Sequence, residues 1–170
     1  MINSYLVGQA QQDDHSIHLL FSANRWEASK SIQDDIRNGT TVIVDRYSFS
    51  GAVYSAAKDN PELSLDWAWS PEIGLLRPDL LIFLDISSAD AAKRGGYGKE
   101  RYETETMQSR VRALFQDLFS RLESINVRVV NAGRPICEVA KEILEVVTTS
   151  ADDPNSKESL GKFGCLRHTT

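Results

Sequence analysis

An acidic and a basic side chain stand together directly after a short apolar run. The run covers residues 40–44, and Asp45 and Arg46 follow it. A carboxylate can bind magnesium or the waters around it, and a planar guanidinium can hold a phosphate through two parallel hydrogen bonds. The pair therefore indicates phosphate chemistry assisted by a metal ion. A structural ion pair at the end of a strand is the alternative, and this feature alone leaves both open.

A second candidate is a basic, glycine-rich stretch in a chain that is acidic overall. Residues 93–101 hold four cations, one anion and three glycines, and Arg94 and Arg101 are two of the cations. Glycines let a loop move or approach a ligand closely. Cations on such a lid can neutralise the charge that develops during phosphoryl transfer. A solvated basic loop is the commoner outcome for a run of charges and stays open.

The third candidate is an aromatic and a cationic side chain spaced for one face of a helix. Phe21 and Arg25 are four residues apart within a predicted helix over residues 13–37, so they share a face. A ring and a guanidinium could hold a planar base by stacking and by hydrogen bonds to its edge. The alternative is that Phe21 belongs to the core and Arg25 pairs with a nearby carboxylate. The three histidines show no metal-binding spacing.

Three apolar runs and three helical patterns must position these side chains. The runs cover residues 40–44, 79–84 and 127–130, and each is nearly continuous, which is typical of strands buried on both faces. Helical periodicity covers residues 13–37, 104–122 and 135–147. The alternation predicts an α/β domain with a parallel sheet, whose ligands bind beyond the carboxyl ends of the strands. Three strands are few for such a sheet, so a small sheet or a missing part is expected.

Composition excludes several classes of protein. The 170 residues are 41% hydrophobic and 25% charged, with a net charge of −5, which fits one globular domain and gives no general attraction to nucleic acid or anionic membranes. No apolar run is long enough to cross a bilayer, and the first residues lack the pattern of a secretory signal. Two cysteines are too few for a disulfide scaffold. We expect an intracellular protein, cytoplasmic in the first instance, with the nucleus and mitochondria as alternatives.

The last residues differ in composition from the rest of the chain. From residue 150 the sequence turns polar, with serine, aspartate, lysine and proline in place of periodic apolar residues. Such a segment cannot bury enough apolar surface to offset the entropy lost on ordering it. The sequence predicts a folded domain over residues 1–149 and a disordered tail over residues 150–170.

Several multi-residue blocks follow one another in an order and spacing that resemble the eukaryotic thymidylate kinases. The resemblance extends over residues 1–147, and it is specific because the blocks occur together. They are residues 14–27, 44–47, 49–51, 65–67, 77–80, 89–95 and 100–103.

The resemblance implies a fold and a reaction. The fold would be the three-layer α/β fold of P-loop nucleoside-monophosphate kinases, with a parallel sheet. The reaction would transfer the γ-phosphoryl group of ATP to dTMP with Mg²⁺, giving ADP and dTDP. The resemblance also implies a homodimer, whereas the acidic composition and the lack of a long apolar run lead us to expect no nucleic-acid or membrane partner.

The resemblance further implies a role for individual side chains. Phe21 would stack on thymine, and Arg25 would hydrogen-bond to the edge of the base. Arg46 would hold the dTMP phosphate, and Asp45 would lie by the magnesium ion and its waters. Ser50 and Gly51 would line the acceptor pocket, and Tyr54 would lie near the sugar. Tyr102 and Gln108 would close the nucleoside side of the site. Arg94 and Arg101 would form the lid over the ATP phosphates.

The chain also departs from that family. It contains no G-x-x-x-x-G-K-[ST] loop and no strand before it, so the phosphate cradle and the phosphate-binding lysine are absent from this sequence. We therefore expect a truncated kinase with little or no activity by itself. One alternative is a non-catalytic nucleotide-binding or regulatory partner derived from such a kinase. The other is a related monophosphate kinase that accepts a different base.

Overall fold

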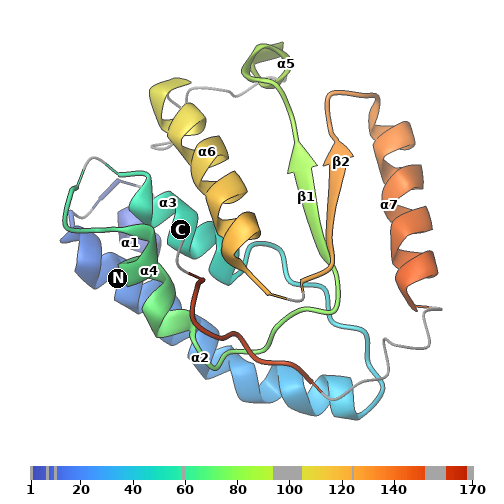
Figure 1. The fold of residues 1–170 in the computed structure, drawn as a ribbon, viewed down its shortest axis with the longest axis horizontal. Coiled ribbons are helices and arrows are strands. Elements are labelled where there is room, and N and C mark those ends of the chain that lie inside the picture. Colours follow the sequence, from blue (N-terminus) through green and yellow to red (C-terminus); the bar gives the residue numbers. More distant parts are fainter. Residues whose placement is uncertain are drawn as a thin grey trace. The chain divides into compact units, whose positions relative to one another are not determined.

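A computed structural model describes most of the chain (Figure 1). The described residues divide into two compact units. The first unit comprises Met1–Leu76, Thr106–Leu122 and Lys162–Thr170, and the second comprises Arg77–Glu105 and Glu123–Gly161. Within these ranges the structure describes residues 2–6, 8–9, 11–58, 60–93, 105–123, 125–151 and 160–167.

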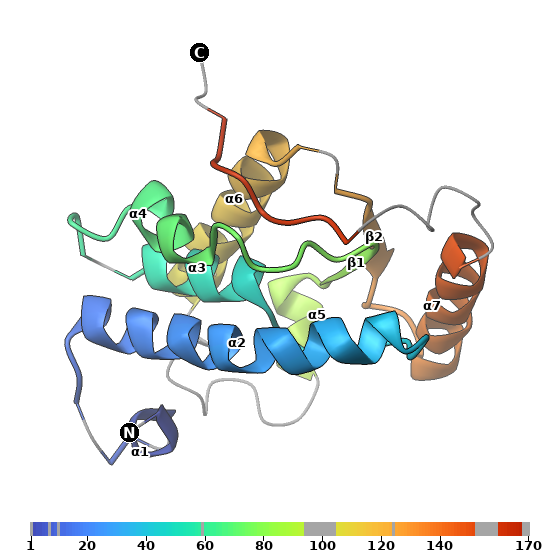
Figure 2. The same cartoon turned by 90° about the horizontal axis from the view of Figure 1, so that it is seen from below.

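The first unit is helical in its described part. Its elements are α1 (Ile2–Leu6), α2 (Asp14–Arg37), α3 (Ser48–Ala56), α4 (Leu65–Trp69), a short 3₁₀ helix η1 (Ser70–Glu72) and α6 (Glu105–Arg121). The predictions of helix over residues 13–37 and 104–122 are confirmed by α2 and α6. Figure 2 shows α3 and α4 lying along one side of α2 and α1 on the other side.

Local signals fix the two ends of the long helix α2. The Asp13 carboxylate accepts hydrogen bonds from the backbone N–H groups of His15 and Ser16, both at 3.0 Å, which satisfies two of the donors that a helix start leaves unpaired. After Arg37 the chain turns at Gly39, whose φ of +83° lies in the left-handed region that glycine adopts without strain.

An aromatic cluster forms part of the core of the first unit. Phe163 lies 4.9 Å from the Trp69 ring and 5.3 Å from the Phe49 ring, both in edge-to-face geometry. All three residues are buried. Other buried apolar residues of this unit are Ile17, Val53, Leu63, Leu75 and Leu118. Ring pairs of this kind stabilise a core beyond the apolar area that they bury.

The second unit contains a two-stranded parallel sheet. Strand β1 (Leu81–Asp85) pairs with β2 (Val127–Asn131) in a register that runs from Leu81 opposite Val127 to Asp85 opposite Asn131. Helix α7 (Ile136–Ala151) packs against β2, and α5 (Ser88–Lys93) follows β1 (Figure 1). The predicted strands over residues 79–84 and 127–130, the parallel pairing and the helix over residues 135–147 are therefore confirmed.

The prediction of a strand over residues 40–44 is wrong for this structure. The segment has no strand assignment, and the side chains of Ile43 and Val44 are 90% and 45% exposed. An apolar run becomes a strand only when its backbone groups pair with a neighbouring strand, and no such neighbour occurs among the described residues. The described sheet accordingly has two strands instead of the three expected.

The prediction of a disordered tail over residues 150–170 is wrong for residues 162–167. Lys162 forms an antiparallel bridge with Leu76, and the side chains of Phe163 and Leu166 are 4% and 8% exposed. These apolar residues are spaced by three in an otherwise polar segment, and their burial provides the stabilisation that the polar composition lacks. Residues 152–159 and 168–170 lie outside the described part, and Ala151 ends α7.

No helix in the described part of the chain combines the length and the apolarity that a bilayer crossing would require.

Candidate functional site

Arg25 is held by a buried carboxylate from another part of the first unit. Its Nε donates to Glu72 Oε2 at 2.7 Å, and its Nη2 donates to Glu72 Oε1 at 2.6 Å. The Glu72 side chain is fully buried and that of Arg25 is 12% exposed. Two parallel charge-assisted hydrogen bonds fix the guanidinium plane as well as its position. The alternative that Arg25 pairs with a nearby carboxylate is thus confirmed.

Helix α2 also holds the turn that carries Glu72. The Trp26 indole N–H donates to the Pro71 carbonyl at 2.7 Å, and the Ser22 hydroxyl donates to the same oxygen at 3.2 Å. Pro71 lies in η1, whose last residue is Glu72. Ser22, Arg25 and Trp26 lie within about one turn of α2, so one helix face binds the turn through both its backbone and its carboxylate.

A glycine allows α3 to approach this ion pair. A Cβ placed on Gly51 would lie 2.8 Å from Arg25 Nη2 and 2.9 Å from Nη1, closer than a carbon atom can come. The absence of a side chain at position 51 therefore lets the guanidinium lie flat against the α3 backbone. Arg25 and Gly51, which the resemblance assigns to the dTMP site, are adjacent in the structure, and their roles in binding remain predictions.

Phe21 lies one helical turn before Arg25, and its side chain is half-buried. It forms no ring pair with any described residue, whereas the core rings Phe49, Trp69 and Phe163 pack on one another. Phe21 is thus not among the fully buried core residues, and its stacking on a base remains a prediction. An aromatic side chain can stack on a planar ring, and a fixed guanidinium beside it can donate hydrogen bonds to the edge of that ring.

The second cationic candidate has a strained backbone. Arg46 has a φ of +63°, the only positive value among the described non-glycine residues. This conformation costs free energy for a residue with a Cβ, and such residues occur preferentially at ligand sites. The Arg46 guanidinium carbon lies 5.9 Å from the centre of the Tyr54 ring, in cation–π geometry. Tyr54 follows Gly51 by one turn of α3.

The remaining residues of this motif are arranged around the start of α3. The Ser50 hydroxyl donates to the Tyr47 carbonyl at 3.1 Å, which leaves its oxygen able to accept a hydrogen bond. The Asp45 carboxylate is exposed and forms no hydrogen bond or ion pair with any described residue. The Tyr47 hydroxyl is buried, and burial, aided by the negative charge of Glu72 and opposed by Arg25, raises its pKa to about 12.

A buried histidine lies on the same face of α2 as Arg25. His18 is 1% exposed, and its Nδ1 lies 2.8 Å from the Ser55 hydroxyl oxygen. Burial lowers the pKa of its imidazole below the ordinary value of 6.5. Of the charges that face it, Glu72 acts in the opposite direction, while Arg25 and Lys58 add to the decrease. His18 is therefore expected to be neutral in the folded chain.

This burial predicts a loss of stability in mild acid. The unfolded chain binds the His18 proton more readily than the folded chain, so the free energy of unfolding is fully retained above about pH 6.5 and falls as the pH decreases below it. His18→Asn, which can keep the bond to Ser55, should flatten this dependence in urea unfolding between pH 7 and 5. His15→Asn, on the same helix, is the control and should keep the slope. An equal slope in His18→Asn and the unaltered chain would contradict the prediction.

The family model for thymidylate kinase matches residues 1–143 of the chain. This chain belongs to the thymidylate kinase family. The thymidylate kinase of Arabidopsis thaliana is 48% identical over 147 residues, which are 86% of this chain and 53% of that protein. The human thymidylate kinase is 41% identical over 163 residues, 96% of this chain and 75% of that protein. The chain thus spans about half to three quarters of the length of these relatives.

A solved structure of the family supports the fold. The thymidylate kinase of Candida albicans matches with a TM-score of 0.78 and 33% identity, and the match covers 96% of this chain and 79% of that one. The predicted α/β fold of the P-loop nucleoside-monophosphate kinases is therefore confirmed.

Several residues expected in a thymidylate kinase site remain predictions. Arg94, Arg101 and Tyr102 lie outside the described residues, so the expected lid has no structural description. Gln108 lies half-buried on α6 of the first unit. Within the described ranges no cluster of three or more His, Cys, Asp or Glu side chains is arranged to hold a metal ion.

Glu72 is the site residue that sequence analysis missed. It lies 47 positions from Arg25, in a three-residue helix without a repeating pattern. The available signal was indirect, because a partly buried arginine requires a carboxylate and the turn before Gly74 holds one.

Proposed function

We propose that this chain carries the acceptor site of a thymidylate kinase, which transfers the γ-phosphoryl group of ATP to dTMP and forms dTDP. The proposal rests on one observation above all: the Arg25 guanidinium is fixed by the buried Glu72 against Gly51, one turn from the half-buried Phe21. Membership of the thymidylate kinase family supports the same reaction.

The chemistry of Arg25 favours thymine over cytosine. A guanidinium only donates hydrogen bonds, and Glu72 accepts one from Nε and one from Nη2. The two N–H groups of Nη1 and the second N–H of Nη2 therefore have no hydrogen-bond partner among the described residues. At the corresponding edge thymine presents the O4 acceptor, whereas cytosine presents an amino donor. Phe21 would stack on the pyrimidine ring. Because Glu72 prevents the guanidinium from turning away, a cytosine would face an unmatched donor.

The second part of the proposed site binds the sugar and phosphate of dTMP. Arg46 would hold the acceptor phosphate. The Tyr54 ring would hold the Arg46 guanidinium by the cation–π contact and would also lie near the sugar. Ser50 and Gly51 would line the pocket, and Tyr102 and Gln108 would close its nucleoside side. These roles are the ones that the family resemblance implies. The residues that would perform them belong to the first unit, except Tyr102, which lies outside the described residues.

ATP and Mg²⁺ are the proposed co-substrate and cofactor. Mg²⁺ is commonly held by one or two carboxylates together with substrate phosphates and waters, and the exposed Asp45 beside Arg46, which has no partner among the described residues, fits that donor set. Bound magnesium neutralises phosphate charge. Arg94 and Arg101 would supply further positive charge over the ATP phosphates.

The test measures nucleotide binding and turnover separately. In titration calorimetry the chain should bind dTMP at least ~10-fold more tightly than dCMP, because cytosine leaves donors unmatched. Arg46→Ala should weaken dTMP binding, whereas Arg37→Ala, an exposed arginine at the end of α2, should not. Equal affinity for dTMP and dCMP would contradict thymine recognition.

The turnover assay follows ADP formation from Mg-ATP that depends on dTMP. Activity that is present in the chain and lost in Arg46→Ala would support the kinase reaction. Equal activity in both preparations would indicate contamination by the host's thymidylate kinase. If the calorimetry also showed selective dTMP binding, this result would favour the alternative of a nucleotide-binding module.

We also propose that the first unit forms a homodimer through an apolar patch. Leu19 and Trp26, two turns apart on α2, are 46% and 44% exposed, and Ile73 is 37% exposed. The Trp26 ring reaches Gly74, the residue after Ile73, where a Cβ would lie 3.2 Å from it. Exposed apolar side chains gathered in this way are typical of protein interfaces.

Leu19→Glu is expected to convert the dimer to a monomer. The substitution places a charge where apolar area would be buried, and it should leave the folded unit intact because the side chain is largely exposed. Sedimentation velocity should show the mass halved. Leu84→Glu, which alters an apolar residue 49% exposed in the other unit, is the control and should leave the mass unchanged. A monomeric unaltered chain would refute the dimer.

A further inference from the structure

The chain near its C-terminus encloses the turn that carries Glu72. The Trp69 indole N–H, just before η1, donates to the Gly164 carbonyl at 2.9 Å. Just after η1, the Gly74 N–H donates to the Phe163 carbonyl at 3.0 Å, and the Phe163 N–H donates to the Leu75 carbonyl at 2.9 Å. Residues 163 and 164 are therefore bonded to both sides of the three-residue helix.

The ring of Phe163 fixes this segment in the core. It is 4% exposed and lies edge-to-face against Trp69 and Phe49, with the Tyr47 ring 6.0 Å away. Phe49 and Tyr47 belong to the stretch that includes Arg46. One side chain thus contacts both the segment before Glu72 and the segment that carries the proposed phosphate-binding arginine.

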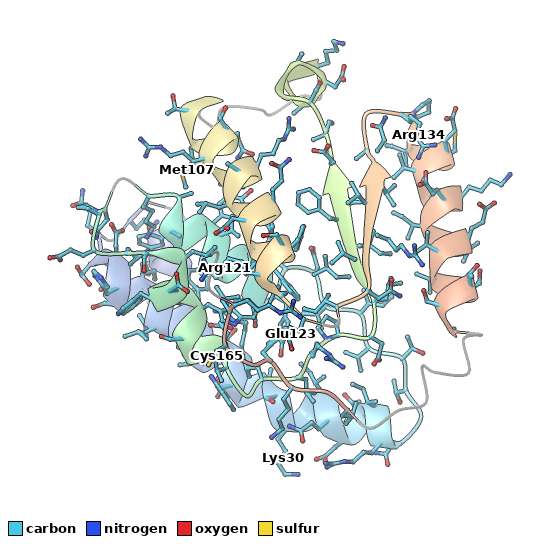
Figure 3. All side chains as sticks on the ribbon, in the orientation of Figure 1. Lys30, Met107, Arg121, Glu123, Arg134 and Cys165 are labelled. Atoms are coloured by element: carbon cyan, nitrogen blue, oxygen red, sulfur yellow. The ribbon has the colours of Figure 1, made fainter. Side chains whose placement is uncertain are left out.

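The other end of the segment is bonded to α6. Arg121 Nε donates to the Arg167 carbonyl at 2.8 Å, and the Arg167 N–H donates to the Arg121 carbonyl at 3.1 Å. The Arg121 side chain is 8% exposed and is paired with Asp66 and Asp117. Figure 3 shows Arg121 near the end of α6, where the segment with Cys165 passes.

We propose that residues 162–167 are a positioning element for base recognition, holding Glu72 and through it Arg25. The path has three steps: the segment fixes the two flanks of η1, η1 fixes the Glu72 carboxylate, and the carboxylate fixes the guanidinium. The identity of the bound base rests on the proposed function, whereas the positioning of Arg25 does not. Phe163 acts through other residues and is a positioning residue.

The first experiment follows Arg25 directly, without nucleotide. The Arg25 Nε–H proton is hydrogen-bonded to a buried carboxylate, so its exchange with water should be slow in ¹⁵N NMR spectra, and its signal should be absent in Arg25→Lys. Phe163→Ala should accelerate this exchange at least ~10-fold, because the turn opens more often. Leu118→Ala, which removes a buried apolar side chain of the same unit and none of the hydrogen bonds or ring pairs named above, should leave it slow.

Milder variants keep the test valid if Phe163→Ala does not fold. Trp69→Phe removes the N–H that donates to Gly164 and retains a ring, so exchange should rise roughly 3-fold. Phe163→Met keeps most of the apolar volume and should restore slow exchange. The proposal would be overturned if the Arg25 Nε–H proton exchanged at an unchanged rate in both Phe163→Ala and Trp69→Phe. If Phe163→Ala does not fold, an unchanged rate in Trp69→Phe would overturn it.

The second experiment compares dTMP with deoxyribose 5-phosphate, which has the sugar and phosphate but no base. Trp69→Phe, which keeps a ring beside Phe49 and removes the N–H that donates to Gly164, should lose part of the preference for dTMP and keep its affinity for deoxyribose 5-phosphate within about 3-fold, a pattern that general unfolding would not give. An unchanged preference would overturn the positioning role. If the unaltered chain showed no preference while Phe163→Ala still accelerated Arg25 exchange, thymine recognition would fail and the positioning of Arg25 would stand.

Discussion

Replacing Glu72 by alanine is expected to lower the free energy of unfolding by about 3–5 kcal/mol and to abolish selective dTMP binding. The substitution leaves the guanidinium of Arg25 in an environment where its side chain is only 12% exposed, without the carboxylate that accepts two of its hydrogen bonds. An uncompensated buried charge costs far more than the pair contributes when intact, because desolvation is then no longer offset by attraction.

A double variant separates the charge from the packing. Arg25→Met with Glu72→Leu removes both charges and keeps apolar volume, so it should be within about 2 kcal/mol of the unaltered chain while still failing to select dTMP. Urea unfolding and calorimetry give the two readouts. A Glu72→Ala chain with unaltered stability would show that the pair is not buried as described and would remove the basis of the proposed base recognition.

Gly51→Ala is expected to weaken dTMP binding by about 10- to 100-fold and to lower the free energy of unfolding by less than Glu72→Ala does, because the ion pair is displaced but not removed. The new methyl group would lie 2.8–2.9 Å from the Arg25 nitrogens, and the guanidinium, held by Glu72, can relieve the overlap only by leaving its position. Displacement of a recognition group by a fraction of an ångström to 1 Å is enough for losses of this size. The higher helix propensity of alanine, worth up to ~1 kcal/mol, offsets part of the strain in α3.

The control for this prediction is Gly164→Ala. A Cβ at Gly164 meets nothing within 4 Å, and the backbone carbonyl that accepts from Trp69 is retained, so the same chemical change is made where there is space and the positioning contact is kept. Titration calorimetry should find the dTMP affinity of Gly164→Ala unchanged within about 2-fold. If Gly51→Ala bound dTMP as tightly as the unaltered chain, the nucleotide would not lie against the Arg25–Gly51 contact, and the proposed pocket would be misplaced.

Features governed by local pattern could be predicted from the sequence by itself. Periodic apolar residues predicted α2, α6 and α7, and the continuous apolar runs predicted β1 and β2 and their parallel pairing. The motif blocks indicated the family, which the family model confirms. These predictions succeed because helical periodicity and motif spacing are properties of neighbouring residues.

Tertiary structure alone decided the features that depend on distant partners. Residues 40–44 have the composition of a strand, yet pairing requires another strand beside them, and Ile43 is 90% exposed. Glu72 becomes the partner of Arg25 across 47 positions, and Phe163 joins the core from a segment whose composition predicts disorder. Strand pairing, burial of a charge and burial of a single ring are each determined by what lies on the other side of the contact, which one segment of sequence does not specify.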